Sequence, residues 1–247
     1  MREAPNAASL FDLTGRVAFV TGGSSGIGRR MALALAAAGA DVVIGGRDAG
    51  ALADAKAELE ATGRRAASVQ ADITDIEVVA GIAAEARKPF GDPHILVNAA
   101  GINLRESTDE ITPESWQKTI DINLSVPFFL GRELATGMIK AGYGRIINIA
   151  SLQTFRAFPN SASYGASKGG VGQLTRAMAE AWSKDGITVN AIAPGFFKTK
   201  LSAPVFADPA IRDANAARTM IGRNGELSDL DGTTIFLAAP ASGYITG

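Results

Sequence analysis

The sequence contains no cysteine and a single histidine, His94. The absence of cysteine excludes disulfide bonds, thiolate metal sites, iron–sulfur clusters and a cysteine nucleophile. One histidine also excludes a metal site built from several imidazoles. No apolar run approaches the ~18 residues of a membrane-spanning helix, and residues 1–16 carry charges where a signal peptide has an apolar segment. We therefore expect a cytoplasmic protein with no membrane partner.

An excess of charge of one sign is also missing. The 24 Lys and Arg residues nearly balance the 25 Asp and Glu residues, and the net charge is −1. Because a nucleic-acid-binding surface needs a clustered positive excess, we predict no nucleic-acid partner. The 247 residues are enough to bury a complete core, and we expect one domain over residues 1–247.

Short apolar segments alternate with helical segments along almost the whole sequence. Six of them are typical of buried strands: Arg16–Val20, Asp41–Ile44, Ala66–Gln70, His94–Val97, Arg145–Ile149 and Thr188–Ile192. This alternation predicts parallel strands, right-handed crossovers and helices on both faces of the sheet. The predicted fold class is therefore α/β, a doubly wound parallel sheet.

Local signals mark where helices begin and end. Gly39 and Gly63 are placed to end the first two helices in a left-handed conformation. Thr112 and Pro113 open a later helix, with the threonine as its cap. Pro194–Gly225 is the longest irregular stretch, and in a compact domain it predicts a lid over a functional site.

A glycine-rich loop, TGGSSGIG, joins the first strand to the first helix. Gly22 permits a tight turn, Gly26 lets the backbone approach a phosphate, and Gly28 lets the helix pack against the strand. The free N–H groups of the helix N-terminus suit a pyrophosphate. The spacing is G-x-x-x-G-x-G rather than the general G-x-G-x-x-G, and its position between strand and helix predicts a dinucleotide site.

Four motifs in this order resemble the short-chain dehydrogenase/reductase family: the TGGSSGIG loop, Asn98-Ala99-Ala100-Gly101, Tyr164-x-x-x-Lys168 and Pro194-Gly195. The resemblance extends from residue 13 to the last residue. It implies a Rossmann fold that uses a nicotinamide nucleotide to interconvert a secondary alcohol and a ketone. Ala99 departs from the family, which usually has a second asparagine there.

The resemblance assigns the catalytic roles to Asn123, Ser151, Tyr164 and Lys168. Tyr164 and Lys168 are four residues apart and project from one helix face. A nearby cation lowers the pKa of a phenol, so this pair can move a proton to or from an alcohol oxygen. Ser151 is implied to hydrogen-bond the substrate oxygen. The asparagine that family members have at the position of Asn123 is implied to hold a water on the proton path. Pro127 is expected to kink the helix nearby.

His94 is the competing candidate for a general base. It lies at the amino end of its predicted strand, whereas ligands of such sheets bind at the carboxyl end. We therefore predict a structural role for His94 and a reaction that requires no metal.

The resemblance implies nucleotide contacts at the ends of the first four strands and in the lid. Asp72 resembles the family's aspartate beside the adenine ring. The implied contacts are Gly22, Ser24, Ser25, Gly26, Ile27, Gly28, Arg47, Asp72, Ile73, Asn98, Ala99, Ala100, Gly101, Tyr164, Lys168, Pro194, Gly195 and Thr199.

The end of the second strand indicates which nucleotide is bound. A carboxylate there accepts hydrogen bonds from the NAD ribose, and NAD-preferring family members carry it at the position of Gly46. Arg47 follows instead, a residue type that pairs with a 2′-phosphate, while Asp48 is expected to cap the next helix. The family often adds a basic residue where Ser25 stands. We expect NADP(H) to be preferred, with NAD(H) possible.

Two segments, Gly101–Ser107 and Ala150–Tyr164, look most like those of sugar-acid enzymes such as gluconate 5-dehydrogenases. The expected substrate is therefore a small sugar acid or polyol. Arg105 is either a partner for a substrate carboxylate or a solvated surface residue. The residues expected to line the substrate pocket are Leu152, Gln153, Phe196 and Phe197.

Two other functions are compatible with the motifs. A 3-oxoacyl-[acyl-carrier-protein] reductase shares every catalytic motif, although its carrier needs a basic patch that is not obvious in this sequence. A non-catalytic nucleotide-sensing protein has the same fold but typically lacks the tyrosine or the lysine, and both are present here.

The family pattern continues past Tyr244–Gly247 with one more strand, so the sequence as given predicts six strands without the final C-terminal one. In the family, that strand and the preceding helix, here about residues 229–238, form one dyad interface of a homotetramer. The helices that contain Asn123 and Tyr164 form the other. We expect a tetramer from a longer chain, and a dimer with an exposed sheet edge if the chain ends here.

Overall fold

The computed structural model describes residues 6–247, and residues 1–5 of the charged N-terminal segment lie outside the described residues. A short helix, α1 (Ala7–Leu10), precedes the first strand. Within the described residues, no helix combines the length and the apolar character needed to cross a membrane.

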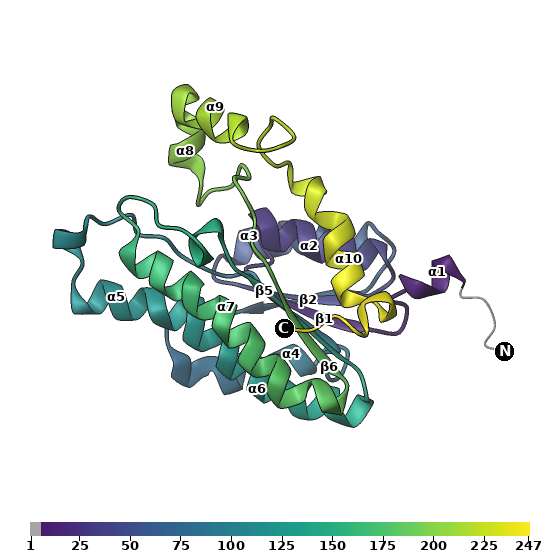
Figure 1. Cartoon of the computed structure of the whole chain (residues 1–247). Helices are drawn as coiled ribbons and strands as arrows, with labels where there is room; N and C mark the ends of the chain where they lie inside the picture. Colours follow the sequence, from purple (N-terminus) through teal and green to yellow (C-terminus); the bar gives the residue numbers. More distant parts are fainter. Residues whose placement is uncertain (1–5) are drawn as a thin grey trace.

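Six parallel strands form one sheet in the order β3-β2-β1-β4-β5-β6 (Figure 1). Every predicted strand is present, and the doubly wound α/β fold is confirmed. The strand order reverses between β1 and β4, and ligands of such sheets bind at the carboxyl ends beside this point. The strands are β1 (Val17–Thr21), β2 (Asp41–Gly46), β3 (Ala66–Gln70), β4 (Ile95–Asn98), β5 (Gly144–Ile149) and β6 (Ile187–Ile192).

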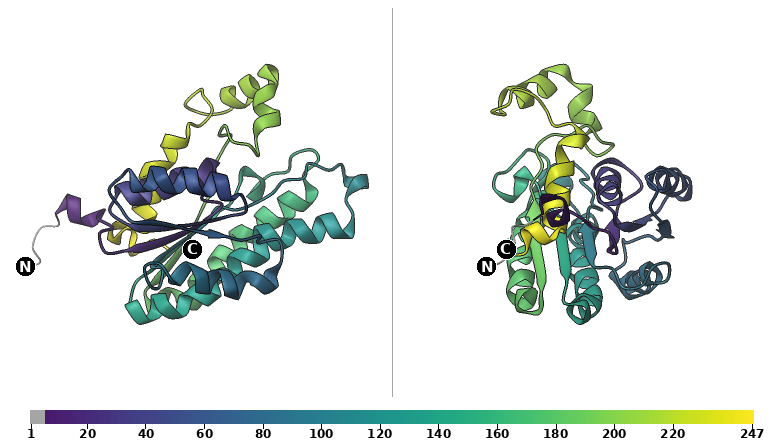
Figure 2. Two further views of the ribbon diagram at one scale, coloured as in Figure 1. Left: turned by 180° about the vertical axis from the view of Figure 1, so that it is seen from behind. Right: turned by 90° about the vertical axis from the view of Figure 1, so that its right-hand side faces the viewer.

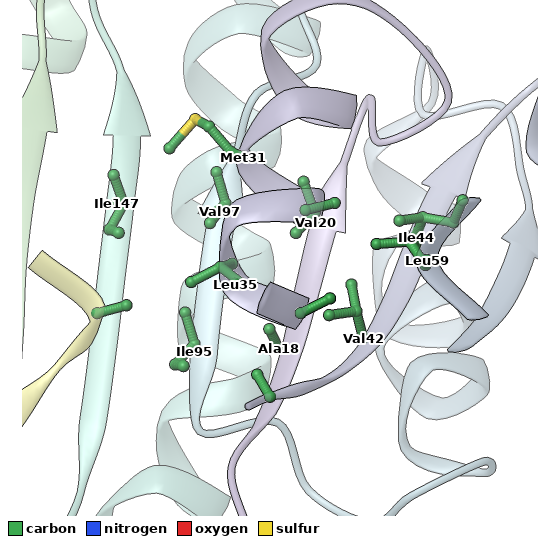
Figure 3. Packing of buried hydrophobic residues seen from close by; sticks show 14 of the residues in the cluster. Ala18, Val20, Met31, Leu35, Val42, Ile44, Leu59, Ile95, Val97 and Ile147 are labelled. Atoms are coloured by element: carbon green, nitrogen blue, oxygen red, sulfur yellow. The ribbon is translucent and has the colours of Figure 1, made fainter. Parts of the chain in front are cut away.

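Helices cover both faces of the sheet (Figure 2). Successive strand residues point to opposite faces, so Val20 packs toward α2 and α3 (Figure 3), while Phe19 belongs to the core on the α6 side. One face is covered by α2 (Gly26–Ala37), α3 (Ala49–Glu60) and α10 (Asp231–Ala238). The other face is covered by α4 (Val79–Arg87), α6 (Val126–Ala141) and α7 (Ala162–Trp182).

The predicted helix signals are confirmed. The Asp48 carboxylate accepts a hydrogen bond from the Ala51 N–H at the start of α3. Thr112 caps α5 (Pro113–Ile120) by accepting a hydrogen bond from the Ser115 N–H. Gly39 and Gly63 follow the first two long helices with positive φ. A π-helical turn, Asp121–Ser125, links α5 to α6 where the kink was expected.

The prediction that Pro194–Gly225 is irregular was wrong. This segment, called the lid here, contains α8 (Ala203–Ala207) and α9 (Pro209–Ala217), which stand above the rest of the domain at the top of Figure 1. A proline lies in the first turn of each helix. Proline is tolerated there because N–H groups in the first turn form no hydrogen bond within the helix. The prolines that favoured an irregular segment in the sequence therefore lie at the starts of two helices.

The last described residues lie along β6. The Gly247 N–H donates a hydrogen bond to the Val189 carbonyl (2.8 Å), and the Asn190 amide donates to the Ile245 carbonyl (2.8 Å). The expected helix over residues 229–238 begins at Asp231, after a 3₁₀ turn over Leu227–Leu230. The predictions about a further strand and the oligomer stay predictions.

Candidate active site

A cavity of about 660 Å³ opens at the carboxyl ends of the strands, beneath the lid. Its walls come from the glycine loop, the ends of β2, β4 and β5, the start of α7 and the base of the lid. This is the edge at which a doubly wound sheet binds its ligands. The motifs that are distant in the sequence therefore meet in one place.

Backbone atoms leave no room for a side chain at Gly22 and Gly28 of the glycine loop. A Cβ on Gly22, whose φ is +66°, would lie 2.9 Å from the backbone of Ala100. A Cβ on Gly28 would lie 2.4 Å from the Gly22 carbonyl oxygen. The Ser25 side chain does not cap α2, and the first turn of α2 lines the cavity. The loop therefore presents helix N–H groups to the cavity, which fits a pyrophosphate.

The tip of β2 carries a cation at the cavity. Arg47 is exposed and lines the cavity, and its carbonyl accepts a hydrogen bond from the Gln70 side chain (3.1 Å). The Asp48 carboxylate is turned to the N-terminus of α3. A Cβ on Gly46 would lie 3.0 Å from Ser24 Oγ, so a side chain would crowd this position. The tip therefore presents a guanidinium rather than a carboxylate.

Two of the predicted site residues do not line the cavity: Asn98 and Asn123. The Asn98 amide donates a hydrogen bond to Asn148 Oδ1 (2.9 Å), which ties β4 to β5. Asn123 Oδ1 accepts from the Ile102 N–H, and its Nδ2 donates to the Ile102 carbonyl (2.9 Å each). Nδ2 also donates to Ser167 Oγ (3.0 Å). Asn123 therefore holds the loop after β4 against α7.

The other predicted nucleotide contacts all line the cavity, as do Ser151, Tyr164 and Lys168. Ser151 follows β5, and its Oγ accepts a hydrogen bond from the Gln153 N–H (3.1 Å). Lys168 Nζ lies 5.7 Å from the centroid of the Tyr164 ring and donates to the Ile149 carbonyl (2.5 Å). A hydroxyl, a phenol and an ammonium are therefore gathered at the end of β5.

Burial dominates the titration of this cluster. It lowers the pKa of Lys168 to about 8. It raises the pKa of Tyr164, against the opposing effects of the Ser151 hydroxyl and the Arg105 charge. The expectation that a neighbouring lysine holds the phenol pKa low was wrong, because desolvation of the phenolate outweighs the nearby charges. The phenol stays protonated at neutral pH and can act as an acid.

Aromatic and apolar side chains complete the cavity on the lid side. All four residues predicted to line the substrate pocket line this cavity. Phe196 makes an edge-to-face contact with Phe158, with ring centroids 6.0 Å apart. Phe158 also lines the cavity, and no sequence motif had indicated it. Its place follows from the fold, because the loop after β5 passes beneath the lid.

His94 lies at the far end of the sheet from the cavity. It immediately precedes β4, and its Nδ1 accepts a hydrogen bond from the Val17 N–H (3.2 Å). Burial lowers its pKa, so the ring is neutral at physiological pH. These observations agree with the predicted structural role. Among residues 6–247, no three His, Asp or Glu side chains gather as metal ligands.

The fold and the site together define a class of protein. A doubly wound sheet presents a helix N-terminus and an arginine at one end of a cavity, and a serine–tyrosine–lysine cluster at the other. The first end fits the pyrophosphate and ribose of a dinucleotide. The second end offers a proton carrier beside a hydrogen-bonding hydroxyl. This combination defines a nucleotide-dependent oxidoreductase.

Comparison with known proteins identifies the family. The model of the short chain dehydrogenase family matches residues 16–210. The chain is 39% identical to the gluconate 5-dehydrogenase of Gluconobacter oxydans, over 96% of this chain and 93% of that one. It is 40% identical to the 2-dehydro-3-deoxy-D-gluconate 5-dehydrogenase of Escherichia coli, over 97% and 94% of the two chains.

A solved structure agrees with these relatives. The gluconate 5-dehydrogenase of Burkholderia cenocepacia, in complex with NADP and tartrate, superimposes with a TM-score of 0.92 and 37% identity, over 98% of this chain and 94% of that one. The chain belongs to the short-chain dehydrogenase/reductase family. It is an oxidoreductase that acts on CH–OH groups with NAD or NADP.

Proposed function

We propose that this protein interconverts a secondary alcohol and a ketone on a small sugar acid, with NADP(H) as the preferred nucleotide. The relatives at 39–40% identity act on gluconate or its dehydro-deoxy derivative, by their names. The position of Arg105 is the observation that carries the proposal to this chain. The Arg105 guanidinium offers a cation for the acid group of the substrate in the cavity that the Tyr164 phenol also lines.

Arg105 is held at the cavity in an unusual conformation. Its φ is +56°, in the left-handed region that non-glycine residues rarely adopt. Nη2 donates a hydrogen bond to the Leu201 carbonyl of the lid (3.3 Å), and the residue lines the cavity. Its charge also acts to lower the pKa of Tyr164. These contacts favour the interpretation of Arg105 as a partner for a substrate carboxylate.

The catalytic steps follow from the positions of Ser151, Tyr164 and Lys168. The chemistry that a bound nicotinamide supplies is hydride transfer to or from the carbon that bears the oxygen. In the reducing direction, Ser151 and Tyr164 donate hydrogen bonds to that oxygen, and Tyr164 gives it a proton. The Lys168 ammonium stabilises the negative charge that grows on the phenol. Donors preorganised toward developing charge usually supply the largest catalytic effect.

The rate of ketone reduction is expected to fall as the pH rises through about 8. The folded-state pKa of Lys168 is lowered to about 8, so its stabilising charge is present below that pH and is lost above it. The raised pKa of Tyr164 keeps the acid protonated over the same range. The measurement is kcat/KM for reduction from pH 6 to 10.

The matched variant for this profile is Lys168→Arg. A guanidinium does not titrate in this range, so the activity that this variant retains should lack the fall near pH 8. A wild-type profile that stays level up to pH 10 would show that Lys168 does not control proton donation.

Arg105→Gln is expected to raise KM for gluconate about tenfold, because a charge-assisted hydrogen bond to a carboxylate contributes roughly 1.5–3 kcal/mol. The value of kcat should change less. An uncharged polyol of the same length is the control, since it has no carboxylate for Arg105 to bind. An equal rise in KM for both substrates would mean that Arg105 only supports the lid through Leu201.

A further inference from the structure

Hydrogen bonds fix the base of the lid beside the glycine loop. The Thr199 N–H donates to Ser202 Oγ (2.9 Å), and the Ser202 N–H donates to Thr199 Oγ1 (3.3 Å). A Cβ on Gly26 would lie 3.3 Å from the Thr199 methyl group, so this turn rests directly on the start of α2. The residue inside the turn, Lys200, therefore has a backbone held at the nucleotide end of the cavity.

Lys200 adds a second cation to the cavity. It is exposed and lines the same cavity as Arg47. The pKa of Asp48 is lowered mainly by the hydrogen bond from the Ala51 N–H, and the Lys200 charge adds to this effect. The geometry agrees with this: Gly46, next to Arg47, lies against Ser24, since a Cβ on Gly46 would be 3.0 Å from Ser24 Oγ. Arg47 and the turn that holds Lys200 therefore both lie beside the glycine loop.

Neither cation is neutralised by an ion pair. Among the ion pairs of residues 6–247, none involves Lys200 or Arg47. A phosphate monoester carries a charge of about −1.5 to −2 near neutral pH, and one guanidinium compensates only part of it. The glycine loop supplies serines rather than a basic residue at this point. A cation from another part of the fold would compensate the rest of the phosphate charge.

We propose that Lys200 is a specificity-determining residue that binds the 2′-phosphate of NADP(H) together with Arg47. The proposal rests on the NADP preference of the proposed function and names a further residue that produces it. The lid, rather than the glycine loop, supplies the second positive charge. Leu201, whose carbonyl accepts the hydrogen bond from Arg105, follows Lys200 directly, so one short segment contacts both the nucleotide site and the substrate site.

The test measures the binding of two nucleotide fragments, 2′,5′-ADP and 5′-AMP, by calorimetry to the full chain. The fragments differ only in the 2′-phosphate. Lys200→Gln is expected to weaken 2′,5′-ADP binding about tenfold, as loss of one charge-assisted contact does, and to leave 5′-AMP binding unchanged. The control is Lys198→Gln, since Lys198 is an exposed lysine of the lid that does not line the cavity.

The other outcomes overturn either the inference about Lys200 or the proposed function. Equal weakening of both fragments would place Lys200 on the shared part of the nucleotide and overturn the inference. If neither fragment bound more weakly, Lys200 would only balance the charge of Asp48, which also overturns the inference. If wild-type protein binds both fragments equally, the NADP preference of the proposed function fails. Retained 5′-AMP binding in the variant shows that it is folded.

Discussion

Replacing Tyr164 with phenylalanine is expected to lower kcat by about 10²–10⁴-fold, the usual contribution of positioned proton transfer. The substitution removes the hydroxyl and keeps the ring. Lys168 keeps its hydrogen bond to the Ile149 carbonyl, because that contact does not involve the phenol. The nucleotide end of the cavity is also untouched. The loss should therefore fall on turnover and leave nucleotide affinity nearly unchanged.

The measurement compares steady-state turnover with the dissociation constant of NADPH for the same preparation. Tyr244→Phe is the matched control, since Tyr244 is fully exposed and does not line the cavity. It removes the same atom without an expected effect. If Tyr164→Phe retained more than about a tenth of wild-type kcat, Tyr164 would not be the proton donor.

Arg47→Ala is expected to remove most of the preference for NADP over NAD. A charge-assisted hydrogen bond to the 2′-phosphate contributes on the order of 1.5–3 kcal/mol, which is roughly ten- to a hundredfold in affinity. NAD has no phosphate at this position, so its use should change little. The preference is measured as the ratio of kcat/KM for the two nucleotides.

The control for this variant is Arg132→Ala, which removes an exposed arginine of α6 that does not line the cavity. The Lys200 substitution provides a second comparison, because Arg47 and Lys200 are proposed to share one phosphate. Neighbouring residues that share a ligand are not expected to contribute additively. A wild-type enzyme that uses NAD as well as NADP would refute the role of Arg47.

The sequence predicted the sheet because its strands are buried on both faces and read as continuous apolar segments. The glycine loop was predictable for a similar reason. Gly22 and Gly28 lie where a side chain would collide with backbone. Glycine at these positions therefore indicates the close approach of two backbone segments. The spacing of Tyr164 and Lys168 was also sufficient, because residues four apart in a helix lie on the same face.

Features that depend on the three-dimensional surroundings were not predictable. The prolines of the lid suggest breaks in regular structure, whereas two of them lie in the first turns of helices. The direction of the Tyr164 pKa shift depends on burial, which outweighs the nearby charges. The place of Lys200 depends on how the lid folds back over Gly26. Each of these needs contacts between segments far apart in the chain.

The sugar-acid dehydrogenase activity is tested most directly by the turnover of purified protein with gluconate and NADP. Turnover is monitored by the absorbance of the reduced nicotinamide. The same preparation is assayed with a polyol and, in the reducing direction, with a 3-oxoacyl thioester. We expect kcat/KM for the sugar acid to be at least about tenfold higher than for the uncharged polyol, because only the acid can bind Arg105 through a carboxylate. Turnover of the thioester alone would contradict it and identify the protein as a 3-oxoacyl reductase.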